Sequence, residues 1–434
     1  MEKDVKPGDR VRVVLEDKTL EGVLMPRPDM ADKEHIVLKM ESGYNIGLDR
    51  SGIKSITVVE KHIEAKHAPS KPLPRRPGKP LVSILSTGGT ISSRVDYRTG
   101  GVYASYTAED LVKIAPELNS LADIKSRFLM NVMSEDMKPP LWAEIAENIA
   151  LELNGGSGGV VVTHGTDTMH YSTAALSFML KNLSKPVVFT GSQRSSDRGS
   201  SDSFLNIVCS TAFAASNVSG VYLVMHGSMS DNYCLAHLGT KVRKMHTSRR
   251  DAFKSINARP AAKILSDGSV ERLMELPHRS EGNVVVDSRM EEKVALIKIY
   301  PGMEPHVIDF YIDRGYRGIV LEGTALGHIP TKVKETSLIP SIEKARDSNV
   351  AVAMTTQCLY GRVHPYVYSN LREVSNRGVV YCEDMLPETA YVKMMWVLGH
   401  TGDVNQAREM MLTNYAGEIT KRTVVEEEFG ECSA

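Results

Sequence analysis

The stretch of sequence that decides the fold reads LVSILSTGGTIS and spans residues 81–92. Its first five residues form an apolar run of the kind that fills a buried strand, and a turn with two glycines follows at once. Residues 159–168, GVVVTHGTDT, show the same succession of an apolar run and a polar loop. Ligands of open α/β sheets gather beyond the carboxyl ends of the strands. The two segments therefore predict adjacent strands with a pocket at their ends.

Outward from these segments, apolar runs and helical spacing alternate along most of the chain. Up to residue 283, further strands are expected at 186–190 and 221–225, with helices at 141–153, 173–183 and 204–215. Beyond it, strands are expected at 294–299, 318–323 and 350–354, with helices at 305–313, 337–347 and 389–398. This alternation is typical of βαβ units. We expect an α/β body with mostly parallel sheets in two domains, residues 81–283 and 284–434.

Residues 1–62 follow a different pattern, with short runs that alternate polar and apolar residues. The runs lie at 9–15, 20–25, 35–40, 44–48 and 56–59. They predict a small all-β, SH3-like barrel, closed because open sheet edges are a liability. Residues 63–80 follow, and their segment KHAPSKPLPRRPGKP is too rich in proline for a helix or a sheet. We expect an extended linker there.

The composition excludes several classes of protein. Of the 434 residues, 52 are Lys or Arg and 53 are Asp or Glu, so the net charge is −1 and lacks the basic excess of a nucleic-acid-binding chain. The five cysteines are scattered and form no ligand cluster, so neither a zinc site nor a disulfide framework is expected. No signal peptide and no apolar run of about 18 residues is found. These observations favour a globular protein of the cytoplasm.

Three residues beyond the strand ends have side chains suited to acyl-transfer chemistry. Thr166 and Asp167 lie in the HGTDT loop, and Lys244 lies in RKMHTSRRDAF at residues 243–253. A partly buried lysine beside them would have a lowered pKa and could act as a base towards a hydroxyl. Each feature also has a plain alternative. The TDT run could simply cap a helix. Residues 243–253 could form a solvated loop, and the glycine turn could be only a tight connection between a strand and a helix.

Two apparent motifs are excluded. The glycine turn at residues 86–92 fits neither a phosphate-binding loop nor a dinucleotide fingerprint. The run GGSGG at residues 155–159 matches the hydrolase pattern G-x-S-x-G, but that elbow needs a strand before it and a helix after it. Here the expected order is the reverse. We expect a flexible connection with a glycine at the helix C-cap.

Taken together, the motifs resemble those of the bacterial-type L-asparaginase/glutaminase family over residues 81–434. The resemblance rests on TGGTI at 87–91, HGTDT at 164–168 and Lys244, supported by SEDM at 134–137 and TTQC at 355–358. The barrel, the linker and HTSRRDAF at 246–253 add a resemblance to GatD, the amidase subunit of archaeal Glu-tRNA(Gln) amidotransferases. A two-domain asparaginase-like body behind a small barrel is the fold that this implies.

The resemblance also implies roles for individual residues. Thr90 matches the nucleophile of a mobile first loop, and Tyr103 matches the tyrosine that assists it. Thr166, Asp167 and Lys244 match a second, rigid triad, and either threonine remains a candidate nucleophile. Ser134 matches a position that binds the α-carboxylate of the substrate. Glu135 stands where related enzymes place a small or amide side chain near the α-ammonium, so a preference for Gln or for Asn stays open.

The implied function is an amidase that releases ammonia from Gln or Asn with no metal or organic cofactor of its own. A GatE-like partner would bind Glu-tRNA(Gln) and activate its glutamate with ATP and Mg²⁺. A homodimer of this chain within a heterotetramer is implied, with residues 322–328 as a candidate contribution across the dimer. Two alternatives are a free-standing L-asparaginase and an interaction protein without activity. The complete set of catalytic residue types argues against the second.

Overall fold

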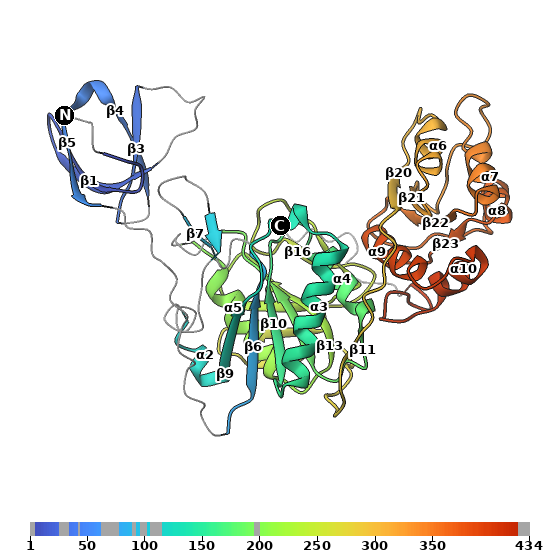
Figure 1. Cartoon of the computed structure of the whole chain (residues 1–434), viewed down its shortest axis with the longest axis horizontal. Helices are drawn as coiled ribbons and strands as arrows, with labels where there is room; N and C mark the ends of the chain where they lie inside the picture. The colour runs from blue at the N-terminus through green and yellow to red at the C-terminus, as the bar shows by residue number, and fades with distance from the viewer. Residues whose placement is uncertain are drawn as a thin grey trace.

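The computed structural model describes residues 5–25, 34–41, 44–61, 78–88, 93–95, 102–104, 115–194 and 200–423. Figure 1 shows an N-terminal sheet in blue, a large central sheet with its helices, and a C-terminal sheet in orange and red. Most of the predicted linker and the predicted nucleophile Thr90 lie outside the described residues. The α/β class predicted for the body is confirmed, and so is the all-β class of the N-terminal unit.

The N-terminal unit is an antiparallel sheet of five strands in the order β4-β3-β2-β1-β5. Val11 and Val13 alternate inward and are fully buried, as the sequence pattern requires. Within the described strands, β4 and β5 stand at the two ends of this order. A 3₁₀ turn at Arg50–Gly52 takes the chain from β4 to β5, which pairs with β1. The strands are β1 Arg10–Leu15, β2 Thr19–Met25, β3 His35–Lys39, β4 Asn45–Asp49 and β5 Ile53–Glu60.

The central sheet has eight strands in the order β18-β17-β14-β13-β12-β10-β6-β9, and the run from β13 to β9 is parallel. Val160 and Val162 pack on one side of the sheet and Val161 on the other, because side chains alternate along a strand. The strands are β6 Leu81–Ser86, β9 Asp123–Phe128, β10 Gly159–Thr163, β12 Pro186–Thr190, β13 Gly220–His226, β14 Tyr233–Leu238, β17 Ala262–Leu265 and β18 Val270–Arg272.

Helices cover both faces of this sheet. Helices α3 (Pro139–Asn154) and α4 (Met169–Met179) pack on one face, and α5 (Ser203–Ala215) packs on the other with the short α2 (Leu118–Leu121). The sequence placed α4 at 173–183, which is wrong at both ends. Residues after Met179 instead form β11 (Leu180–Lys181), which pairs with β19 (Val285–Val286).

The second half of the GGSGG run is closely packed, and its flexibility stays a prediction. Ser157 is buried, and its hydroxyl lies 2.7 Å from that of Ser83. A Cβ at Gly159 would lie 2.1 Å from the carbonyl oxygen of Ala214. Gly155 is the C-cap of α3, as predicted. Close packing against strand β6 and helix α5 therefore accounts for Gly158 and Gly159.

The C-terminal sheet is parallel, in the order β20-β21-β22-β23. Helix α9 is buried along almost its whole length and joins the core of this sheet to that of the central one, where the rings of Phe178 and Trp396 stack. The elements are β20 Val294–Lys298, α6 His306–Asp313, β21 Gly318–Gly323, α7 Ile339–Asp347, β22 Ala351–Thr356, α8 Ser369–Asn376, β23 Val380–Tyr381, α9 Pro387–Leu398 and α10 Val404–Leu412.

Candidate active site

Strands β6 and β10 lie side by side, and their carboxyl ends place the two predicted loops together. Ser86 at the end of β6 is in register with Thr163 at the end of β10. The buried hydroxyl of Thr87 donates to the carbonyl oxygen of Thr163 at 2.9 Å. Gly88 has φ +111°, and a Cβ there would lie 2.7 Å from the carbonyl oxygen of Val132. Only glycine fits this turn without strain, because its φ is positive and the backbone approaches closely.

Lys244 joins Thr166 and Asp167, as the sequence predicted. Its amine donates to the Thr166 hydroxyl at 2.8 Å and lies 2.6 Å from a carboxylate oxygen of Asp167. Lys244 ends β15 (Val242–Lys244), which pairs with β16 (Phe253–Ser255) in a short hairpin. The Thr166 and Lys244 side chains are almost buried, whereas 66% of the Asp167 side chain is exposed. An amine at this distance from a hydroxyl can exchange a proton with it.

His164 holds the loop that carries Thr166 through its two ring nitrogens. Its Nδ1 lies 2.6 Å from the carbonyl oxygen of Gly165, and its Nε2 lies 2.9 Å from the Ser172 hydroxyl. Trp142 donates its indole N–H to the same hydroxyl at 2.9 Å. Burial lowers the pKa of His164 to about 4, so the ring is neutral at pH 7. No role was predicted for this histidine, although it opens the HGTDT loop.

His170 is a second buried histidine near the site. Burial lowers its pKa to about 3, and the charges of Arg243 and Lys244 act in the same direction. Within the described part of the chain, its Nδ1 is buried without a hydrogen-bond partner. A neutral ring therefore lies within the electrostatic influence of the Lys244 amine. Only its position early in α4, just beyond the HGTDT loop, could have drawn attention to it.

Ser134 and Glu135 lie in a 3₁₀ turn, Ser134–Asp136, that touches the same loop. The hydroxyl of Thr168 donates to the carbonyl oxygen of Ser134. A Cβ at Gly165 would come within 2.8 Å of the Ser134 side chain, so this serine packs directly against the loop. Ser134 is buried, whereas Glu135 is exposed. The turn is thus beside the Thr166 loop, where the resemblance requires a substrate contact.

For two predicted residues the structure describes no side chain. Thr90 lies outside the described residues, and Tyr103 is described only by its backbone. Tyr103 belongs to β8 (Val102–Ala104), which pairs with β7 (Ser93–Val95) so that Tyr103 is opposite Arg94. The predicted role of each therefore stays a prediction.

Residues 322–328, expected to act across a dimer, begin within β21 and continue past its end at Gly323. Glu322 is half-buried, and burial together with the charge of Glu388 raises its pKa. The backbone then turns, and Thr324 pairs with His328 in an isolated bridge. These contacts are all within one chain, so the contribution across a dimer stays a prediction.

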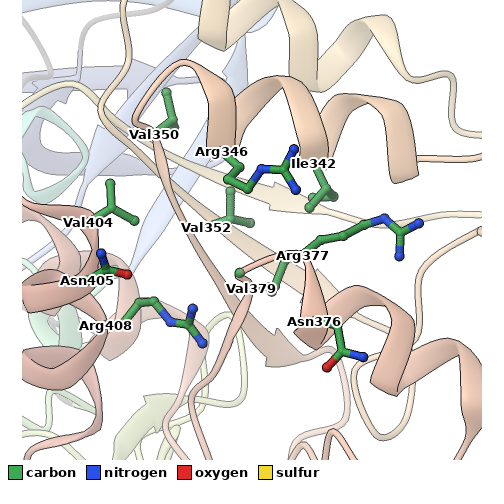
Figure 2. Close-up of a pocket in the computed structure, with 11 residues that line it drawn as sticks. Ile342, Arg346, Val350, Val352, Asn376, Arg377, Val379, Val404, Asn405 and Arg408 are labelled. Atoms are coloured by element: carbon green, nitrogen blue, oxygen red, sulfur yellow. The ribbon is translucent and has the colours of Figure 1, made fainter.

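A cavity of about 190 Å³ lies in the C-terminal domain. Figure 2 shows Arg346, Arg377 and Arg408 around it, with valines between them. Glu343 accepts from Arg377 at 2.9 Å, and Asp347 accepts from Arg346 at 2.9 Å, so much of the positive charge is compensated. The described residues that line this cavity include none of the predicted site residues. The candidate active site therefore remains the one at the ends of β6 and β10.

Metal-binding clusters and membrane spans would each leave a recognisable arrangement of residues. Among the described residues, no group of three or more His, Cys, Asp or Glu side chains is arranged to hold a metal ion. In that part of the chain, no helix combines the length and the apolar character needed to cross a bilayer.

Comparison with known proteins connects all three parts of the chain. The family described as "Asparaginase, N-terminal" matches residues 81–277, and "Glutaminase/Asparaginase C-terminal domain" matches residues 293–411. The "GatD N-terminal domain" matches residues 5–59. Among solved structures, the thermostable L-asparaginase from Thermococcus kodakarensis has a TM-score of 0.70 and 33% identity, covering 78% of this chain and 99% of that one.

Curated relatives extend over nearly the whole chain. The D subunit of glutamyl-tRNA(Gln) amidotransferase from Pyrococcus furiosus is 55% identical over 434 residues, 97% of each chain. The protein of the same name from Methanothermobacter thermautotrophicus is 51% identical and covers 96% of this chain and 95% of its own length. The chain therefore belongs to the family of glutamyl-tRNA(Gln) amidotransferase D subunits, with an asparaginase-like body behind a GatD N-terminal domain.

Proposed function

We propose that this chain is the amidase subunit of a Glu-tRNA(Gln) amidotransferase and releases ammonia from Gln or Asn by means of a threonine nucleophile. One observation carries the proposal: the Lys244 amine joins the Thr166 hydroxyl and the Asp167 carboxylate where two parallel strands end. Ligand sites of open α/β sheets are found at this position. The family membership supplies the reaction class.

In the proposed reaction, a threonine hydroxyl attacks the carbonyl carbon of the side-chain amide. Lys244, oriented by Asp167, or Tyr103 takes the hydroxyl proton and returns it to the departing nitrogen, so that ammonia leaves and an acyl-enzyme ester remains. Backbone N–H groups of the glycine turn stabilise the oxyanion. Water then hydrolyses the ester and regenerates the threonine. The contact of Lys244 with Thr166 supports a proton shuttle at this hydroxyl.

Either Thr90 or Thr166 serves as the nucleophile in this proposal. Ser134 is proposed to bind the α-carboxylate of the amino acid, since it packs against the Thr166 loop. Glu135 is proposed to face the α-ammonium. The steps are acyl transfer and proton transfer, for which hydroxyl, amine and carboxylate groups suffice, so we propose no metal or organic cofactor for this chain.

The proposed partner is a GatE-like protein that binds Glu-tRNA(Gln) and activates its glutamate with ATP and Mg²⁺. The near-zero net charge of this chain supports the assignment of tRNA binding to the partner. A homodimer of this chain within a cytoplasmic heterotetramer is proposed, and residues 322–328 are proposed to complete the site across the dimer. The N-terminal sheet is proposed to serve assembly, because it lies outside the asparaginase-like body.

A free-standing L-asparaginase is the second candidate, and the structural likeness to the Thermococcus kodakarensis L-asparaginase favours it. Ammonia release from Gln and Asn separates the two candidates. It should be measured for the chain alone and for the chain with its partner, Glu-tRNA(Gln), ATP and Mg²⁺. The proposal expects turnover that rises when the loaded partner is added. Vigorous hydrolysis of Asn by the chain alone, unchanged by the partner, would instead support the L-asparaginase.

A further inference from the structure

The segment that leads into Lys244 is anchored in the C-terminal domain. The Lys241 amine lies 2.8 Å from a carboxylate oxygen of Asp384, and both side chains are fully buried. Asp384 also accepts from the backbone N–H of Thr420 at 2.9 Å and from its hydroxyl at 2.5 Å. Its carbonyl oxygen accepts from the Asn257 side chain at 3.1 Å. A buried pair with so many partners has little freedom to move.

Arg243 makes a second connection, directly beside Lys244. Its guanidinium lies 3.0 Å from a carboxylate oxygen of Glu388 in the first turn of α9. Successive side chains of a strand point to opposite faces. Arg243 therefore reaches the C-terminal domain, whereas Lys244 reaches Thr166. The other Glu388 oxygen is buried without a partner among the described residues, so this carboxylate depends on the contact with Arg243.

Backbone contacts add to this connection. The Thr389 hydroxyl donates to the carbonyl oxygen of Thr240 at 2.9 Å, and the Thr240 hydroxyl donates to the carbonyl oxygen of Ala416 at 3.1 Å. Residues 240, 241 and 243 are thus each bound to the C-terminal domain. Lys244 is the next residue, and its amine enters the site of the N-terminal α/β domain.

We propose that Arg243 and Glu388 are positioning residues for Lys244, and that the C-terminal domain holds the Lys244 amine in place through them. The hydrogen bond to the Thr166 hydroxyl comes from Lys244 itself, so the two residues act through Lys244. The geometric part of the proposal rests on the contacts above. Its catalytic consequence rests on the proposed amidase function. The experiment therefore measures the accessibility of Lys244 and the rate of ammonia release separately.

The test is acetylation of Lys244 by acetic anhydride in the full-length chain, quantified by peptide mass spectrometry. Wild type, Glu388→Gln and Arg243→Gln are compared, with Lys254 as the internal reference. Glu383→Gln is the matched control, because Glu383 lies in the same segment but pairs with Arg362 at 2.9 Å. Lys244 has 10% of its side chain exposed, so its labelling should be slow in the wild type.

The proposal expects Lys244 labelling to rise about fivefold in Glu388→Gln and Arg243→Gln, the size of one net hydrogen bond lost. Glu383→Gln should match the wild type, and Arg243→Lys should restore most of the protection because it keeps the charge. Unchanged labelling in both test variants, or an equal rise in Glu383→Gln, would overturn the proposal. If Glu388→Gln does not fold, Lys244 labelling in Arg243→Gln and Arg243→Lys still tests the proposal, because Arg243 is partly exposed.

Steady-state kinetics test the catalytic consequence. In the complex with the partner, Glu388→Gln should lower kcat for ammonia release about tenfold with KM unchanged, because a small misplacement of a catalytic group costs rate. A rise in Lys244 labelling without any change in kcat would overturn the catalytic consequence. Absence of ammonia release from the wild type would contradict the proposed function, while the labelling would still decide the positioning.

Discussion

Two lysines that lie three residues apart on one segment each pair with an aspartate, and the two pairs differ in how far they are exposed to solvent. Lys241 and Asp384 are 2.8 Å apart with 0% and 1% of their side chains exposed. Lys244 and Asp167 are 2.6 Å apart, but Asp167 is 66% exposed. The same two residue types thus serve two purposes. Lys241 and Asp384, the closed pair, have their partners within the protein, whereas Lys244 and Asp167, the open pair, leave the lysine next to the Thr166 hydroxyl, where the reaction is proposed.

The largest expected effect concerns the open pair. Lys244→Met should lower ammonia release by about a thousandfold or more if the proposed base is Lys244 rather than Tyr103, because the threonine would then lose its base. Lys254→Met is the control, since Lys254 lies on the paired strand β16 and its amine lies 3.3 Å from a carboxylate oxygen of Asp251. Assays of both variants in the complex check the prediction. Retained activity in Lys244→Met with an intact fold would show that the base lies elsewhere.

The closed pair should matter more for stability than for chemistry. Lys241→Met leaves Asp384 buried without its cation, which should lower the free energy of unfolding by about 3–5 kcal/mol. Denaturant unfolding followed by circular dichroism measures this. Lys393→Met breaks another fully buried pair, with Glu418 at 2.6 Å, and should cost a similar amount. A loss below about 1 kcal/mol, the range of exposed pairs, would contradict the distinction.

Acid should weaken the loop of the open pair through His164. Burial lowers the pKa of His164 from 6.5 to about 4, so the folded state resists protonation more than the unfolded state does. The contribution to stability is present above pH 6.5 and is lost progressively as the pH falls towards 4. At pH 4.5 the loss due to His164 should be about 2–3 kcal/mol. Unfolding of wild type and His164→Gln at pH 7.5 and pH 4.5 tests this, and equal losses in both proteins would refute it.

The smallest expected effect is that of Asp167 on stability. Its carboxylate is mostly exposed, so Asp167→Asn should change the free energy of unfolding by less than about 1 kcal/mol. Ammonia release should nevertheless fall, because the Lys244 amine loses the group that orients it. Denaturant unfolding and the ammonia assay on the same preparation check both parts. A large loss of stability would mean that the open pair also supports the fold.

Much of the fold could be predicted because most of the parallel strands of the two sheets are continuous apolar runs. β10 and β12 are buried at every residue, which is what a sheet covered on both faces requires. β9 was missed because its sequence, DIKSRF, has only one buried residue at the sheet edge. α10 was missed although Asp403 caps its first turn by accepting from Asn405 and Gln406. That cap was a signal that the sequence offered.

The site was only partly predictable. Thr166 and Asp167 stood out because they follow a buried strand, and Lys244 stood out through the resemblance and its order in the chain. The pairs Lys241–Asp384 and Arg243–Glu388 could not be predicted, because no local pattern links a lysine to an aspartate 143 residues away. Such contacts arise from the packing of α9 between the two sheets. The sequence therefore indicated the proposed reacting groups better than it indicated the contacts that hold them.

The most direct test of the amidase account is rapid quenching after the chain, in its complex, is mixed with Gln or Asn, followed by peptide mass spectrometry. The account predicts an acyl ester on the peptide that contains Thr90 or Thr166, formed together with one equivalent of ammonia. The identity of that peptide would also show which threonine is the nucleophile. Ammonia release with no ester on either threonine, or an ester at another residue, would contradict the account.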